Sequence, residues 1–172
     1  MENLRYPIGK FECPEQITSA HIDQWISDIE MLPIKIINLV SDFSEEKLKT
    51  TYRDGGWTAR QVIHHIHDSH HHGYIRFKWA LTEDAPIIKP YVEQLWAELF
   101  DAKSAPIHLS LDLLKALHAK WVYFLKGLSD DDLKRTFIHP EGDVSISLAE
   151  DIGIYAWHGN HHLAHLNIIA NI

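Results

Sequence analysis

Four stretches of this chain repeat apolar residues at the spacing of an α-helix, and this pattern limits the fold more than any other feature. The predicted helices cover about residues 19–41, 58–81, 110–128 and 147–170. In each of them apolar residues recur three or four positions apart, so that one face of the helix is apolar and the other is polar. Such helices bury their apolar faces against one another, and strand signals are almost absent. We therefore predict an all-α protein, an antiparallel four-helix bundle.

Capping residues and a proline mark where these helices begin and bend. Thr58 with Gln61, and Ser147 with Glu150, have the pattern of a capping box, in which a hydroxyl at the helix start precedes Gln or Glu by three residues. Ser110 is a plain hydroxyl cap for the third helix. In the first helix, Pro33 should cause a kink, because proline lacks an amide hydrogen and clashes with the preceding turn.

The connections differ in length. Pro86 and Pro90 break the chain after the second helix, and a short helix is expected over about residues 91–100. Residues 137–147 contain a proline, a glycine and an alternating apolar pattern, which suits a loop or a small hairpin. We expect a long connection between helices two and three and shorter ones elsewhere.

Length and charge narrow the functional class. A chain of 172 residues is expected to form a single domain, residues 1–172, and its net charge of −8 argues against a nucleic-acid partner. No apolar segment is long enough to span a membrane, and the N-terminus does not have the pattern of a signal peptide. The single cysteine, Cys13, excludes an internal disulfide, and we assign it no catalytic role. We predict a cytoplasmic protein with small-molecule partners; its oligomeric state stays open, with a homodimer among the alternatives.

Histidines gather at two places on the predicted helices. Ten of the fourteen lie there: His64, His65, His67, His70, His71 and His72 on the second helix, and His158, His161, His162 and His165 on the fourth. The last four form two pairs spaced i, i+4, which places two imidazoles one turn apart on nearly the same face. Such a pair can bind one metal ion, and the second helix can provide a third ligand. We therefore predict a metal site.

On the fourth helix, the apolar stripe favours one of the two pairs. At about 100° per residue, His162 lies on the stripe and His158 roughly 70° from its centre. On the same count His165 is roughly 90° and His161 roughly 130° away. His158 and His162 are therefore the predicted ligands, and Gly159 between them should leave room for a bound species.

The second helix leaves the third ligand open. Its most apolar stripe passes through His70, whereas a neighbouring and more polar stripe through His65 could line a cavity. The pattern alone ranks His70 slightly ahead of His65.

Several motifs together resemble the DinB-like superfamily and, within it, the YfiT branch, whose members are described as metal-dependent hydrolases and as bacillithiol S-transferases. The resemblance covers nearly the whole chain and rests on residues 54–65, 69–70, 74–78, 81–83, 137–140, 155–158 and 161–165.

The resemblance implies a four-helix bundle that binds one divalent metal through three histidines. One of them lies on the second helix, as the second histidine of a His-His pair, which is His65 here. The other two form an H-x-x-x-H pair on the fourth helix, which is His158 and His162. We follow the resemblance in choosing His65, and keep His70 and His67 as alternatives.

Three neutral imidazoles leave an open coordination position, as in catalytic sites. We expect zinc or nickel, with manganese and iron as alternatives. The open position can hold a water or a thiol, and the metal lowers the pKa of either. The H-E-x-x-H pattern of hydrolytic zinc sites is absent, and nothing in the sequence places Glu150, Asp151 or Asp68 near the metal. We therefore favour a thiol S-transferase acting on a small-molecule thiol and an electrophile; the alternatives are a hydrolase of a small amide or ester and a non-catalytic metal-binding bundle.

Overall fold

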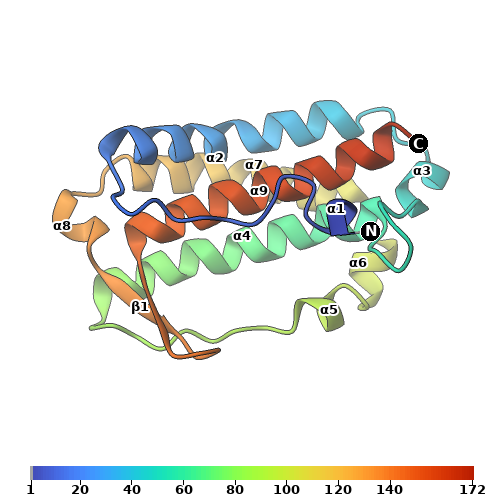
Figure 1. Cartoon of the computed structure of the whole chain (residues 1–172). Helices are drawn as coiled ribbons and strands as arrows, with labels where there is room; N and C mark the ends of the chain where they lie inside the picture. The colour runs from blue at the N-terminus through green and yellow to red at the C-terminus, as the bar shows by residue number, and fades with distance from the viewer. Residues whose placement is uncertain (1) are drawn as a thin grey trace.

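The computed structural model describes residues 2–172, with side chains from residue 3 onward, and four long helices form the predicted bundle (Figure 1). These helices are α2 (Ser19–Val40), α4 (Ala59–Thr82), α7 (Ile107–Leu125) and α9 (Leu148–Ala170). The main packing partners of α2 are α7 and α9, and the same two helices are the main partners of α4. The consecutive helices α2 and α4 therefore lie across the diagonal of the bundle.

The four helices run as two parallel pairs. Figure 1 shows α2 and α9 running in one direction and α4 and α7 in the other. Side-chain contacts agree, because His64 of α4 meets Ser110 of α7 and, further along both helices, His70 meets His118. The prediction of an antiparallel bundle is therefore correct for α2 against α7 and for α4 against α9, and wrong within the two parallel pairs.

The parallel arrangement of α4 and α7 explains the predicted long connection between them. A chain that leaves one helix and enters a parallel neighbour must first return along the length of the bundle. Residues 83–106 do this, running along the bundle in Figure 1. They carry two short helices, α5 (Glu93–Trp96) and α6 (Phe100–Ser104), where the sequence predicts one.

Two predictions about helix starts have opposite outcomes. The capping box at the start of α4 is confirmed, with Thr58 and Gln61 bonded to each other's backbone amides. The prediction that Ser110 caps the third helix is wrong, because α7 begins three residues earlier, after Pro106. Instead, the Ser110 hydroxyl lies inside the bundle, 2.7 Å from Nδ1 of His64.

Short elements complete the fold at the ends of the bundle. They are α1 (Glu2–Arg5), α3 (Glu45–Lys49), α8 (Asp130–Leu133), β1 (Thr136–His139) and β2 (Val144–Ser147). The two strands form the small hairpin that the sequence suggests, with Thr136 opposite Ser147 in an antiparallel register.

The core consists of two apolar clusters with buried histidines between them. The cluster toward α8 includes Ile26, Ile29, Phe77, Trp121, Phe137 and Ile152. The cluster toward α3 includes Leu32, Ile36, Val62, Ile63, Leu114 and Leu166. His70 on α4 and His118 on α7 fall between members of the two clusters and are 0% and 1% exposed. Because buried polar groups need hydrogen-bond partners, this histidine layer must be satisfied from within the bundle.

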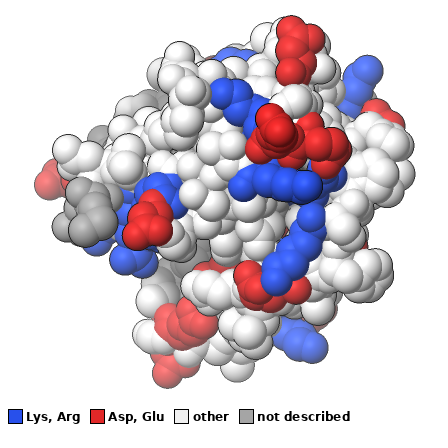
Figure 2. Space-filling model, turned by 90° about the vertical axis from the view of Figure 1, so that its right-hand side faces the viewer, with Lys and Arg blue, Asp and Glu red and all other residues white. Residues whose placement is uncertain are grey.

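The surface at one end of the bundle carries charge of both signs. Figure 2 shows the face on the right of Figure 1, where basic and acidic side chains are interspersed. A surface that binds the phosphate backbone of a nucleic acid would instead concentrate positive charge. Among residues 2–172, no helix has both the length and the apolar character of a membrane span.

Candidate metal site

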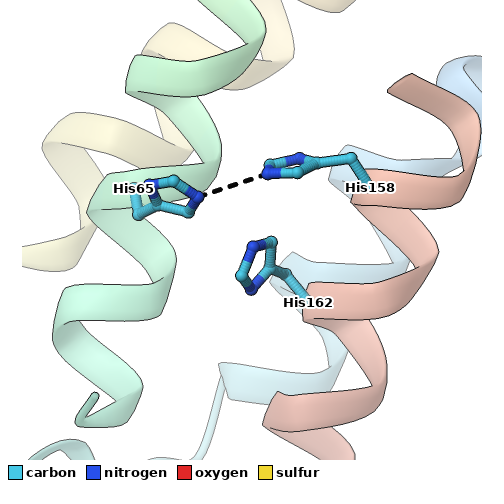
Figure 3. A group of neighbouring side chains, drawn as sticks. All are labelled: His65, His158 and His162. Atoms are coloured by element: carbon cyan, nitrogen blue, oxygen red, sulfur yellow. Dashed lines mark hydrogen bonds between the residues drawn. The ribbon is translucent and has the colours of Figure 1, made fainter. Parts of the chain in front are cut away.

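The three histidines predicted as metal ligands converge between α4 and α9. Figure 3 shows His65 of α4 pointing toward His158 and His162, which lie one turn apart on α9. One nitrogen from each lies within 4.8 Å of the others. The Nε2 atoms of His65 and His158 are 3.2 Å apart, close to the roughly 3.3 Å between two nitrogens that bind one tetrahedral zinc at 2.0–2.1 Å. The triad is therefore spaced to hold a metal ion.

The histidine triad lies on the wall of a cavity of about 510 Å³. Aromatic side chains form much of the rest of the lining: Tyr6, Tyr52, Trp57, Tyr91, Tyr155 and Trp157. The indole of Trp57 has its ring centroid 4.6 Å from that of His65 and 6.2 Å from that of His162. A cavity of this size can take a small molecule, with the triad at its wall.

Two glycines let the helices around the triad approach closely. A Cβ atom on Gly159 would lie 2.5 Å from Cδ2 of Leu32 on α2, and one on Gly73 would lie 2.5 Å from Cζ of Tyr155. The prediction that Gly159 leaves room for a bound species is therefore wrong, since the space beside it is filled by Leu32. Its role is to bring α9 against α2.

Burial keeps the three imidazoles neutral. It lowers the pKa of His65 from 6.5 to about 4. The pKa values of His158 and His162 lie well below the ordinary value, first because of burial and then because a charged neighbouring histidine would repel a second charge. Neutral imidazole is the form that binds metals, so the site needs no deprotonation at neutral pH.

His158 ends a chain of three histidines that begins at a backbone carbonyl. The carbonyl of Ile29 accepts a hydrogen bond from Nδ1 of His118 at 2.6 Å. Because a neutral imidazole carries one N–H, Nε2 of His118 must accept, and it does so from Nδ1 of His70 at 2.9 Å. Nε2 of His70 in turn accepts from Nδ1 of His158 at 3.1 Å. These tautomers, assigned from the network, leave a lone pair on Nε2 of His158, the atom that faces His65.

Pro33 explains why the carbonyl of Ile29 is free to anchor this chain. In an α-helix that carbonyl would accept a hydrogen bond from the amide four residues later. That residue is Pro33, which has no amide hydrogen, and α2 nevertheless continues through it. The freed carbonyl bonds to His118 instead. The sequence predicts only a kink from this proline, because its effect on the site depends on how α7 packs against α2.

A shorter chain orients His162 in the same way. Nε2 of His165 donates to the carbonyl of Arg5, the last residue of α1, at 3.2 Å. Nδ1 of His165 therefore accepts from Nδ1 of His162 at 3.3 Å, which leaves the lone pair of His162 on Nε2. His162 is thus held by a histidine that is itself tied to a backbone carbonyl, whereas His158 is held by His70, which reaches a carbonyl through His118. Hydrogen bonds of this kind fix the tautomer of a metal-binding histidine.

A second group of histidines is close enough to hold a metal ion, but one of its members, His165, is engaged elsewhere. His161, His162 and His165 also bring one nitrogen each within 4.8 Å of the others. Both ring nitrogens of His165, however, take part in the chain from Arg5 to His162. The ring of His161 stacks on Trp157, with centroids 4.7 Å apart. We therefore place the candidate metal at the triad of His65, His158 and His162.

The structure separates the histidines that sequence analysis kept as alternatives. His70 is fully buried and both its nitrogens are bonded within the chain to His158. His67 lies with Nδ1 3.5 Å from a carboxylate oxygen of Asp68. Neither belongs to a group of described residues that could hold a metal. His118 is not among the site residues predicted from the sequence, although a polar residue on the apolar face of the third helix is a signal that could have identified it.

The carboxylates that sequence analysis considered as bases do not line the cavity. Glu150, Asp151 and Asp68 are absent from its walls. Asp151 is buried, which raises the pKa of its carboxyl to about 7, but it lies nearly two helical turns before His158. Among residues 3–172, the carboxylates that do line the cavity are Glu93 of α5 and Glu141 in the hairpin turn.

Similarity to known proteins agrees with this fold. The DinB superfamily profile matches residues 28–166. A protein of Oceanobacillus iheyensis named "putative metal-dependent hydrolase" is 54% identical over 164 residues, which cover 95% of this chain and 94% of the relative. A Bacillus cereus protein of the same name is 52% identical over 167 residues, covering 96% and 95% of the two chains.

A solved structure is similar over almost the full length. YfiT from Bacillus subtilis, described as a probable metal-dependent hydrolase with an unusual four-helix bundle topology, superposes with a TM-score of 0.96 at 45% identity. The match covers 98% of this chain and 97% of that one. With the profile match and relatives more than half identical in sequence, the chain belongs to the DinB superfamily.

Proposed function

We propose that this protein is a metal-dependent enzyme in which His65, His158 and His162 hold one divalent ion, zinc or nickel. The observation that carries the proposal is the convergence of three neutral imidazoles on the wall of a cavity. Three nitrogen ligands leave a coordination position open. A metal there would supply Lewis acidity, which favours the ionised form of a thiol or water.

We further propose that the reaction transfers a small-molecule thiol to an electrophile. The sulfur forms the new bond, the leaving group departs with its electron pair, and the thiol proton passes to solvent. This chemistry needs no carboxylate base beside the triad. It fits a cavity whose carboxylates, among residues 3–172, come from α5 and the hairpin turn. The resemblance of the sequence motifs to the bacillithiol S-transferases also supports a thiol substrate.

Hydrolysis of a small amide or ester is the second candidate. It is favoured by the names of the relatives, which describe them as metal-dependent hydrolases. In this reaction Glu93 or Glu141, the carboxylates of the cavity wall, would have to act as the base.

The test compares the two reactions on the same metal-loaded protein. One assay offers a thiol with a chromogenic aryl halide, and the other offers a nitrophenyl ester or an anilide without thiol. We expect turnover that requires both metal and thiol, and that is lost in His158→Ala but kept in His161→Ala. Ester or amide turnover without thiol would identify a hydrolase. Silence in both assays at full metal occupancy would contradict an enzymatic role.

A further inference from the structure

Two arginines of the cavity wall flank the histidine triad. Arg76 lies on α4, three turns after His65, and Arg53 lies in the segment before α4. Arg53 lies over the ring of Tyr52, 5.5 Å from its centroid, and that ring stacks on His165 with centroids 3.9 Å apart. Along α4, Arg76 and Arg53 therefore lie on opposite sides of His65, on the wall of the same cavity.

Neither arginine has the partners that a partly buried guanidinium needs. The Nε atoms of Arg53 and Arg76 are buried and have no hydrogen-bond partner within residues 3–172. Among the described residues, the guanidinium of Arg76 makes no hydrogen bond; that of Arg53 makes one, from Nη1 to the carbonyl of Asp54 at 2.9 Å, and its only other interaction is with the ring of Tyr52, 5.5 Å from the centroid. Arg60 shows the contrast, since its guanidinium bonds to Glu45 and to the carbonyl of Ala105, both at 2.6 Å. Leaving charged donors unpaired costs free energy unless a ligand completes them.

The carboxylates nearby do not neutralise these two charges. Glu93 and Glu141 also line the cavity, but neither forms an ion pair with Arg53 or Arg76 among residues 3–172. Asp151 interacts electrostatically with Arg76, but these two residues form no ion pair among residues 3–172, and Asp151 does not line the cavity. A chain with a net charge of −8 thus keeps unpaired cations beside its candidate metal site.

We propose that Arg53 and Arg76 bind oxyanion groups of the substrate. The cavity would then take a small molecule with carboxylate or phosphate groups on the two sides of the reacting atom. A guanidinium binds such groups through paired N–H donors, and the edge that contains Nε is one of its paired faces. The identity of the reacting atom as sulfur rests on the proposed function, whereas the anion site does not.

The test is a binding series in which only the anionic charge of the thiol changes. Mercaptoethanol, mercaptopropionate and mercaptosuccinate carry no, one and two carboxylates, and their binding to the zinc-loaded protein can be measured by isothermal titration calorimetry. We expect the affinity to rise about tenfold or more with each carboxylate, as for charge-assisted hydrogen bonds. Titrations with succinate and with inorganic phosphate, using metal-free protein, separate a preference for carboxylates from one for phosphates without contributions from metal or thiol.

Variants assign the effect to the two arginines. Arg53→Gln and Arg76→Gln should each lose about tenfold to a hundredfold in affinity for mercaptosuccinate and little for mercaptoethanol. Lys115→Gln is the matched control, because it removes one positive charge from an exposed position on α7 outside the cavity. If a glutamine variant does not fold, Arg→Lys at that position keeps the charge without the planar fork and should still bind mercaptosuccinate more weakly.

Two results would overturn the proposal. One is equal affinity for the three thiols, and the other is unchanged mercaptosuccinate binding in folded variants of both arginines. Failure of the proposed function looks different: arginine-dependent succinate binding by a protein without thiol turnover would leave the anion site standing. If thiol turnover does not depend on the number of carboxylates in the thiol, this result would instead support the transferase and contradict the anion site.

Discussion

Replacing His118 tests whether the buried histidine chain orients a metal ligand. The His118 side chain is 1% exposed and does not line the cavity, so replacing it leaves the candidate ligands in place. His118→Leu removes the bond to the Ile29 carbonyl and the acceptor for Nδ1 of His70. His70 can then turn its N–H toward His158, and His158 loses the tautomer that directs a lone pair at the metal.

Two magnitudes follow from this structure. Loss of the hydrogen bonds behind a metal ligand typically weakens binding by about tenfold to a hundredfold, or about 1.4–2.8 kcal/mol. The Ile29 carbonyl and Nδ1 of His70, both left without a partner, would each cost about 1–3 kcal/mol of folding stability. A domain with about 5–15 kcal/mol of stability can bear that loss, so the variant should fold with a lower melting temperature.

The assay is competition for zinc between the protein and a chromogenic chelator. His118→Gln is the conservative variant, because its amide offers both a donor and an acceptor, and it should recover part of the affinity. His108→Leu is the matched control, since His108 is exposed on the same helix. Wild-type zinc affinity in a folded His118→Leu protein would refute the orienting role of the chain.

Four further predictions concern the same site. Pro33→Ala restores the amide that competes for the Ile29 carbonyl, so zinc affinity should fall even if the melting temperature rises; an unchanged affinity would contradict this reading of Pro33. Single alanine variants of the three triad histidines should lose metal measured by elemental analysis, whereas His161→Ala should retain it. A chelator should lower the melting temperature, because metal at a thousandfold excess over Kd stabilises the fold by about 4 kcal/mol, while far-ultraviolet circular dichroism persists; complete loss of helix would mean a structural metal. Burial depresses the pKa of His65 and of His118 from 6.5 to about 4, so the unfolded chain binds more protons between these values. The metal-free protein should therefore lose stability as pH falls through this window, and a melting temperature constant from pH 6.5 to 4 would contradict the neutral chain.

The sequence by itself determined the features that depend on neighbours within a few residues. The apolar period predicts the four long helices, with α2 and α9 ending within a residue of the expected positions. The capping box of Thr58 and Gln61 is a local pattern, and so is the pair formed by His158 and His162, which share a face because they are one helical turn apart.

Tertiary structure alone decided what depends on residues far apart in the chain. Nothing local distinguishes a parallel from an antiparallel neighbour, so the pairing of α4 with α7 follows only from the packed bundle. The apolar stripe alone ranks His70 slightly ahead of His65, because both lie on inward-facing sides of α4, and only the family resemblance favours His65. Packing turns His65 to the cavity and His70 to His118. The carbonyl freed by Pro33 acquires a function only because α7 places an imidazole beside it, 89 residues further along the chain.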